Sequence, residues 1–459
     1  MIREKRQRRK RRLLTPLALL IAAYFAWFCY SRITYRPDPR LAYWESRFRE
    51  INPEAPGMVP YEEAVDVSKQ GRRLLTVWTE LPDVYDPCKA LSGPWDSLAN
   101  DAVAGARALF TSDDFRIEHA RFENVVRLGW AVPPGWNEDS FQDFVDFRPW
   151  AILLTTYARF LQEDRQDPVG QYDIWRRILE ASDCVDPSRE CWALMTAERV
   201  RIVVSTYAIV WCREAPEDLK IPIADEFLTP DAYLDQPVST RVERSIASEH
   251  AHFDRIFVTE GGWLDVSTAI GVNWQTDPCS RLWNLTSFVY FSRSEAEAEF
   301  SRYVARLDRC ANAAAMNKAF DSDYDRNLSP SVLMLSGGGD WRGPYQSYLG
   351  TSFFSRTCCE AAAATIALHN DRADRGAYPD ALDELVPTYL RRPPIDFGDG
   401  APLRYQRSGD VYRLYSVGLD GVDHHGVKIA RFNTLSSEWD TKGSDVSFGA
   451  LRRADWSPR

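Results

Sequence analysis

The sequence lacks the short motifs that mark many catalytic and metal sites. It contains no Cys-x-x-Cys, no Gly-x-Ser-x-Gly and no His-Glu-x-x-His. The first absence removes support for a zinc ribbon or a thioredoxin-like redox site, since both use closely spaced thiolates. The other two remove support for an α/β-type serine hydrolase and a zinc protease. With six histidines and no recognisable triad, hydrolysis has no positive support, and the balance is against an enzyme.

Compositional bias and fixed-period repeats are also missing. The 459 residues are 45% hydrophobic, 13% aromatic and 27% charged. These values are typical of globular proteins and exclude a largely disordered chain. The length suits two or three domains. A regular solenoid is not supported, because no period recurs.

Charge is absent from residues 13–30, directly after a strongly basic start. Residues 1–12 hold eight Lys or Arg and one acid, Glu4. A helix of eighteen residues spans about 27 Å, enough for the core of a bilayer. Tyr24, Trp27 and Tyr30 lie towards its far end, as in an interfacial aromatic belt. We therefore expect a transmembrane anchor at 13–30, with residues 1–12 in the cytoplasm.

Two other interpretations of this start are weaker. A cleavable signal peptide would end in small residues, but residues 27–30 read Trp-Phe-Cys-Tyr, and Cys29 lacks the small residues that precede a lipid-modified cysteine. A basic arm that binds nucleic acid would not continue into an apolar run. The whole chain carries −10 and residues 1–12 carry +7, so the remainder carries −17. That acidic remainder argues against nucleic acid as a partner.

The rest of the chain divides by composition. Residues 31–60 are rich in proline and read as a linker. Residues 61–353 read as a large, irregular, mainly helical domain, with helical spacing of apolar residues over 149–163 and 190–213 and a further helix over 294–319. Residues 354–459 read as a smaller domain, in which a helix over 354–371 precedes a β-hairpin over 403–417. The expected fold class is therefore α+β.

Cysteine usage is compatible with an oxidising compartment. Besides Cys29 there are eight cysteines, an even number that permits disulfides. Cys184 and Cys191 bracket a turn-like segment and are the best local pair, with buried free thiols as the alternative. Cys358 and Cys359 are adjacent in sequence, and adjacent cysteines rarely form a disulfide with each other. Each is therefore expected to pair with a more distant cysteine.

The end of the chain carries a recognisable series of short motifs. In order, they are Tyr378-Pro379-Asp380, Asp396-Phe397, Pro402-Leu403-Arg404-Tyr405 and Tyr415-Ser416-Val417-Gly418-Leu419-Asp420-Gly421. Over residues 355–450 this region resembles the C-terminal globular part of the major pseudopilin of type II secretion systems. The resemblance implies a three-stranded sheet against a long helix, a calcium ion in the last loop, and a bacterial envelope protein with its bulk in the periplasm.

The departures from that family are large. A pseudopilin begins with a short leader, a Gly-Phe cleavage site and an early Glu in its apolar helix, and residues 1–30 have none of these. The body at 61–370 has no counterpart in a pseudopilin. The chain is therefore expected to be a larger protein, anchored in the inner membrane, with a pseudopilin-like end.

The last loop contains oxygen ligands of the kind that calcium prefers. By the resemblance, the best matches are the carbonyl of Ser416 and the carboxylates of Asp420 and Asp445, with Asp423 as a further candidate. The family often ends with two adjacent acids where this chain has Ser444-Asp445. The alternative is that these Asp and Gly residues serve only turns. A transition-metal site at His424-His425 is disfavoured, because adjacent side chains on an extended chain point apart.

Three other groups of residues have a functional interpretation and a simpler one. His250 and His252, with Glu249 and Asp254, would share a face on a strand, but their segment reads as helical. Residues 336–340 (Ser-Gly-Gly-Gly-Asp) lack the Lys-Ser/Thr of a phosphate loop and read as a turn. Acids beside tryptophans at 260–265 and 340–341 are typical of carbohydrate sites, although tryptophan is more often core filler.

These observations leave three hypotheses for the function. The favoured one is a single-pass envelope protein with a binding or assembly role and a calcium-stabilised end. The second is a membrane-anchored envelope enzyme that acts on glycans, and the third is an accessory component of a secretion apparatus. The sequence names neither the protein partner nor a substrate.

Overall fold

The computed structural model describes residues 57–79, 100–131, 145–183, 191–236, 238–241, 302–320, 342–426, 431–433, 438–440 and 445–448, with Ala23 and Ala26. The chain divides into two units. Nearly all described residues belong to the unit made of Arg49–Ser248, Leu307–Asp321 and Arg342–Arg459. Of the other unit, the description covers Ala23, Ala26 and residues 302–306, all helical.

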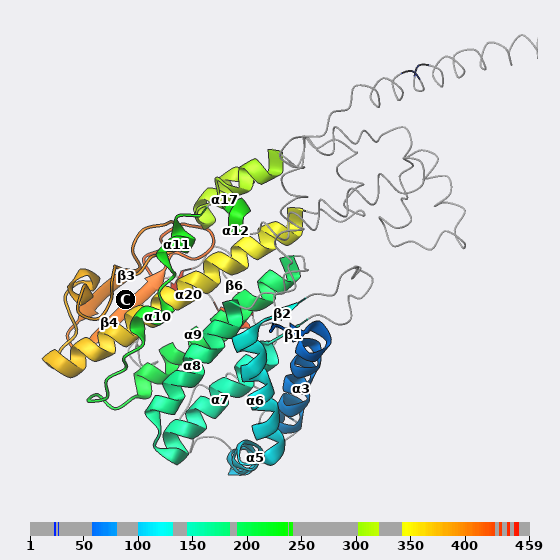
Figure 1. The fold of residues 1–459 in the computed structure, drawn as a ribbon. Helices are drawn as coiled ribbons and strands as arrows, with labels where there is room; N and C mark the ends of the chain where they lie inside the picture. The colour runs from blue at the N-terminus through cyan, green and yellow to red at the C-terminus, as the bar shows by residue number, and fades with distance from the viewer. Residues whose placement is uncertain are drawn as a thin grey trace, which may run out of the picture. The chain divides into compact units, whose positions relative to one another are not determined.

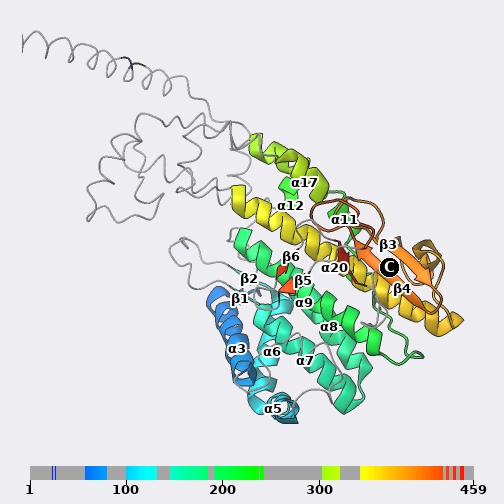
Figure 2. The same cartoon turned by 180° about the vertical axis from the view of Figure 1, so that it is seen from behind.

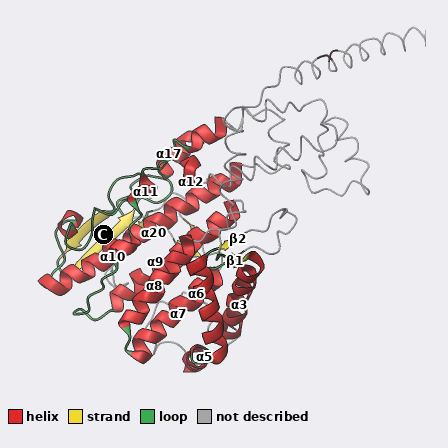
Figure 3. Ribbon diagram, viewed as in Figure 1, coloured by secondary structure: helices red, strands yellow, loops and turns green. Residues whose placement is uncertain are grey.

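The larger unit is mostly helical and carries one small antiparallel sheet of three strands (Figures 1 and 3). The expected α+β class is confirmed at this level. Its helices are α3 (Tyr61–Thr79), α5 (Asn100–Phe110), α6 (Asp113–Leu128), α7 (Arg148–Arg165), α8 (Pro168–Asp183), α9 (Cys191–Glu214), α10 (Ala224–Phe227), α11 (Asp231–Leu234), α12 (Val238–Arg241), α17 (Ala313–Ala319), α20 (Arg342–Arg375) and the 3-10 turn η3 (Leu382–Leu385). The strands are β1 (Val59–Pro60), β2 (Trp130–Ala131), β3 (Arg404–Ser408), β4 (Val411–Ser416), β5 (Arg431–Asn433), β6 (Glu438–Asp440) and β7 (Val446–Ser447).

Local signals set several helix ends. Ser112 caps α6 by accepting a hydrogen bond from the amide of Phe115. Gly129 ends the same helix with φ of 66°, a backbone conformation that glycine adopts without strain, and its N–H donates to the carbonyl of Val125. Helix α7 has Pro149 in its first turn, where no amide hydrogen bond is lost.

Helices α9 and α20 pack along each other at the centre of the unit, and both views show them side by side (Figures 1 and 2). The run of four alanines at 361–364 on α20 is fully buried, and these small side chains allow a close approach of neighbouring backbones. Helix α7 packs on α3, α8 and α9. Where α3 meets α7, a Cβ on Gly71 would lie 2.8 Å from Cγ of the buried Trp150. Only glycine fits this crossing.

The three-stranded sheet has the order β3-β4-β7 and is antiparallel throughout. Strands β3 and β4 form the expected hairpin, in which Ser408 pairs with Val411 and Gly409 turns with φ of 63°. Strand β7 returns to pair with the end of β4, with Ser416 opposite Val446. Two smaller pairs are β1-β2, which is parallel, and β5-β6, which is antiparallel.

The structure confirms some sequence predictions and corrects others. The helices expected at 149–163, 190–213 and 354–371 are present as α7, α9 and part of α20. The single helix expected over 294–319 is wrong in its described part, because the chain turns at 308–312 and α17 starts after its cap, Asn312. The division expected at 353/354 falls inside α20, which is continuous there.

The transmembrane anchor expected at 13–30 lies outside the described residues, apart from the helical Ala23 and Ala26. Among the helices of the described ranges, none is both long and apolar enough to cross a bilayer.

Candidate functional site

The four predicted calcium ligands lie at one corner of the sheet, at the end of β4, in the loop after it and at the start of β7, without converging on one point. Ser416 ends β4, Asp420 and Asp423 lie in the loop that follows, and Asp445 directly precedes β7. Because β7 pairs with the end of β4, Asp445 returns to this loop. Its Oδ1 accepts from the amide of His424 (3.1 Å) and its Oδ2 from the amide of Gly426 (2.6 Å). Asp445 is fully buried and ties down the end of the loop.

The other two carboxylates face local donors. Asp420 accepts from the amide of Val422 (3.0 Å) and lies 3.1 Å from Nε2 of His424. Asp423 accepts from the amide of His425 at 2.7 Å. The two histidine rings lie beside different acids, His424 Nε2 3.1 Å from Asp420 and His425 Nδ1 3.6 Å from Asp423. Within the ranges that the structure describes, no three His, Cys, Asp or Glu side chains converge on a metal position, so a calcium ion would require the loop acids to turn from their present partners.

Asp396 organises the same corner, a role that its place in the Asp396-Phe397 motif does not reveal. It is fully buried and accepts from Ser416 Oγ (2.7 Å) and from the amides of Gly398 (2.8 Å) and Val417 (2.9 Å). Arg404 Nη1 lies 3.1 Å from its Oδ2. Burial raises the pKa of Asp396 above its ordinary value, although all four donors act in the opposite direction. In the sequence, the signal for this turn is an aspartate, Asp396, followed two positions later by a glycine, Gly398.

Helix α17 contacts both the turn at Phe397-Gly398 and the loop after β4. Its first amides, Ala313 and Ala314, donate to the carbonyls of Phe397 and Gly398, both at 2.9 Å. Asn317 donates to the carbonyl of Leu419 at 2.8 Å. A large apolar side chain, Val422, remains 53% exposed on the loop. The loop is therefore anchored at its base and presents an apolar tip.

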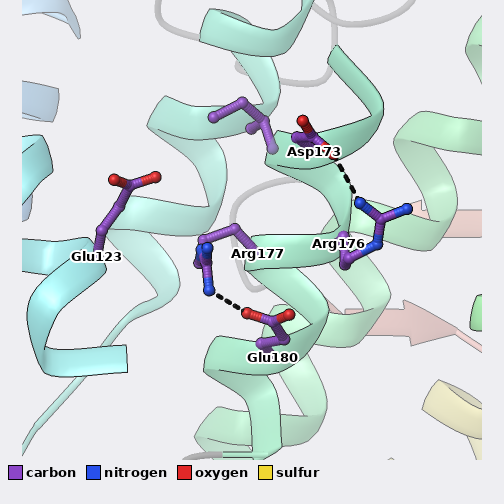
Figure 4. A pocket seen from close by; sticks show the side chains of 6 residues that line it. Glu123, Asp173, Arg176, Arg177 and Glu180 are labelled. Atoms are coloured by element: carbon purple, nitrogen blue, oxygen red, sulfur yellow. Dashed lines mark hydrogen bonds and ion pairs between the residues drawn. The ribbon is translucent and has the colours of Figure 1, made fainter. Parts of the chain in front are cut away.

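A separate cavity of about 290 Å³ lies between α6 and α8 (Figure 4). The residues that line it are Glu123, Asp173, Ile174, Arg176, Arg177 and Glu180. Arg176 pairs with Asp173 at 2.6 Å, and Arg177 pairs with Glu180. These pairs are three residues apart on one helix and partly exposed, so they contribute little energy. The cavity offers charge of both signs and no nucleophile, which makes it a weak candidate for catalysis.

His119 lies one turn before Glu123 on α6; its Nε2 is buried and is 3.9 Å from Oε1 of Glu123. Its ring stacks on Phe115, with ring centroids 5.4 Å apart. Burial lowers the pKa of His119, and Glu123 opposes that shift. The imidazole is thus part of an aromatic core rather than a ligand at the cavity surface.

The remaining sequence candidates are outside the described residues or buried. The histidine pair at 250 and 252 with Glu249 and Asp254, the segments at 260–265 and 336–341, and Cys184 all lie outside. Cys212, Cys310, Cys358 and Cys359 are buried and, in the part of the chain that the structure describes, none of these four forms a disulfide. The described tryptophan side chains, at positions 130, 150, 175 and 211, are buried in the core and offer no platform for a sugar.

The geometry thus points to the sheet corner at Asp396 and Asp445 as the candidate site. No protein-family model, no curated protein and no solved structure matches the chain.

Proposed function

We propose that this chain is a single-pass, membrane-anchored protein of the bacterial envelope with a binding or assembly role. Its proposed binding element is the module of α20, η3 and the β3-β4-β7 sheet. The observation that carries the proposal is the loop at 418–426, which is fixed at its base by Asp396 and Asp445 and presents the exposed Val422. A loop that is fixed at its base and carries an exposed apolar side chain can place that side chain in a pocket of another protein.

The resemblance to the pseudopilin end supports this proposal. A long helix against a three-stranded antiparallel sheet is the arrangement that the resemblance implies, and α20 contacts β4 in this way. The motif residues also contact one another. Tyr405 donates from its hydroxyl to the carbonyl of Pro379 at 2.8 Å, and Tyr378 packs edge-on against Tyr412 with centroids 4.8 Å apart.

The buried acids pair with arginines, and this pairing favours a binding role over a catalytic one. Asp146, Glu198, Glu360 and Asp396 are buried, and each faces an arginine. Arginine stays charged at any working pH and cannot exchange protons as an acid–base partner does. These acids therefore serve to join helices and loops.

Calcium is proposed as a stabiliser of the loop, held by the carbonyl of Ser416 and the carboxylates of Asp420, Asp423 and Asp445. In support, Asp445 accepts two backbone amides, which leaves each carboxylate oxygen a lone pair for a cation. We expect calcium to raise the melting temperature of the full-length protein in detergent, relative to a chelator. The gain is about 2.7 kcal/mol at a hundredfold excess over the dissociation constant.

The calcium effect should disappear in Asp420→Asn and persist in Asp235→Asn, a control on the exposed end of α11. Differential scanning calorimetry with calcium and with EGTA measures both. An equal melting temperature in the two buffers for the wild type would remove calcium from the proposal and leave the loop as packing alone.

The binding role has its own test. A photo-cross-linking residue at position 422 should yield one discrete product with an envelope assembly protein, such as a pseudopilin, in intact cells. The same residue at position 169 is the control, because Val169 is 66% exposed on α8 and far in sequence from the module. Mass spectrometry identifies the product. Equal, diffuse cross-linking from both positions would contradict a specific binding loop.

A further inference from the structure

Strand β3 (Arg404–Ser408) lies at the edge of the three-stranded sheet, and among the described strands only β4 pairs with it. In an antiparallel pair, residues alternate along each strand. The main-chain N–H and C=O of one residue bond to the neighbouring strand, and those of the next residue point away from it. The register of the hairpin therefore decides which groups of β3 are left at the outer edge of the sheet.

Tyr405 and Arg407 are the residues of β3 whose main-chain groups point outward. Tyr405 is opposite Leu414 on β4. The carbonyl of Leu414 accepts from the amide of Phe448, on the β7 side, at 2.8 Å, so the main-chain groups of this pair do not bond across β3 and β4. The N–H and C=O of Tyr405 consequently point away from β4, and those of Arg407, two residues on, do the same.

The chain itself occupies the beginning of this edge. Leu403 lies two residues before Tyr405 in the outward row, and its N–H donates to the carbonyl of Pro394 at 3.0 Å. An isolated antiparallel bridge joins the same two segments. Just before Pro394 the chain is drawn to α20, where Arg392 pairs with Glu360 at 2.8 Å. The outer edge of β3 is thus a position where a further strand begins to pair and then stops.

Beyond Leu403 the outward groups face solvent. In the part of the chain that the structure describes, the main-chain N–H and C=O of Tyr405 and Arg407 have no hydrogen-bond partner. Gln406, Arg407 and Ser408 are exposed, whereas the side chain of Arg407 is only 29% exposed, so its main chain carries much of its exposure. Residues two apart on a strand are about 7 Å apart, and these two therefore present donors and acceptors at the spacing of a further strand.

We propose that β3 binds an extended segment of a partner protein, which adds to the sheet as a fourth strand. Main-chain groups in this alternating pattern are matched by the backbone of another strand, and strand addition is a recurring mode of peptide recognition. The proposal goes beyond the binding role of the loop at 418–426, because it uses main-chain groups of β3 and does not need Val422.

The charge of β3 indicates which partner fits. The strand contains two arginines and no acid. Arg407 donates through Nη1 to Asp380 (2.8 Å) and through Nε to the carbonyl of Gly409 (3.1 Å), and its Nη2 has no acceptor among the described residues. An acidic side chain on the added strand would meet this group, and opposite charges across a strand pair are favourable. Two copies joined through β3 would instead bring the arginines of both strands together, so an acidic segment of a partner fits better than a second copy.

The test is photo-cross-linking of the full-length protein in intact cells, with the photoreactive residue at position 406. The exposed Gln406 lies between the two outward-pointing residues. We expect one discrete product, in which mass spectrometry maps the cross-links on the partner to a single segment that contains acidic residues. The same photoreactive residue at position 117 is the control, because Ile117 is 55% exposed on α6, and it should not give this product.

Arg407→Pro is the main variant. It removes an outward N–H but none of the bonds to β4, and proline is tolerated at such an edge position. The loss of one hydrogen bond to the partner should lower the product about tenfold. If thermal unfolding shows that this variant does not fold, Arg407→Glu decides, because it keeps the main chain and repels an acidic segment. Arg116→Glu, on the surface of α6, is the matched control and should leave the product unchanged.

Three results would each overturn the proposal: no product from position 406, equal product in the wild type and the folded Arg407 variant, or a product that joins two copies of this chain. The last would assign the edge to self-association. A discrete product from position 406 stands whether or not position 422 cross-links, so the two binding surfaces are tested separately.

Discussion

Replacing Glu360 with alanine is expected to lower the free energy of unfolding by about 3–5 kcal/mol, because it breaks a buried ion pair from one side. Glu360 on α20 is fully buried. Its Oε1 and Oε2 each lie 2.8 Å from a terminal nitrogen of Arg392. The same oxygens accept from the amides of Thr229 (2.8 Å) and Ile395 (3.0 Å). The substitution would leave the two amides without this acceptor and would take from the Arg392 guanidinium its buried carboxylate, with the carbonyl of Thr229 (2.7 Å) and the exposed Asp231 remaining as partners.

Chemical denaturation of the full-length protein measures this loss. Glu217→Ala is the control, since that acid also pairs with an arginine at 2.8 Å but is 77% exposed, and it should cost less than about 1 kcal/mol. The double variant Glu360→Leu, Arg392→Leu should recover much of the stability, because it removes both charges together. A Glu360→Ala variant as stable as the Glu217→Ala control would show that the pair does not hold the two loops to α20.

Asp396→Ala is expected to cost about 3 kcal/mol and to release the loop at 418–426. The carboxylate satisfies the amides of Gly398 and Val417 and the hydroxyl of Ser416, and an unsatisfied buried donor costs about 1–3 kcal/mol. The space is also tight, since a Cβ on Gly398 would lie 2.5 Å from the carbonyl oxygen of Gly418. Asp396 is the side chain that links these two crossing turns directly, through the amides of Gly398 and Val417.

Hydrogen exchange of the full-length protein gives the local readout. Amides at 417–426 should lose protection in Asp396→Ala, while those of α9 keep theirs. Asp380→Ala is the control, because Asp380 pairs with Arg407 on the surface. Cross-linking from position 422 should fall in Asp396→Ala but not in the control. Unchanged protection of the loop would mean that α17 and Asp445 hold it without Asp396.

Elements with a strong local period were predictable. Helices α7 and α9 follow from apolar residues at helical spacing, and the β3-β4 hairpin follows from β-forming residues around Ser408, Gly409 and Asp410. In each case the signal lies within about twenty residues, so no distant part of the chain is needed to read it.

Elements that depend on distant contacts were not predictable. The break before α17 is fixed by Asn312, which caps it, and by amides that donate to Phe397 and Gly398, more than eighty residues away. The extension of α20 before residue 354 is set by its packing on α9, since its own residues at 342–353 include glycine and proline, which are poor helix formers.

The sequence by itself determined the helical body, the hairpin and the acid-bearing loop after it, because these depend on periodicity and turn residues that act over short distances. Only the tertiary structure decided which acids are buried and stabilise the fold. Glu198 meets Ser355 across 157 positions, and Glu360 meets Thr229 across 131. The sequence shows these residues as ordinary charges on helices. Their importance comes from burial, which makes every unpaired charge costly and which only the packing of distant helices creates.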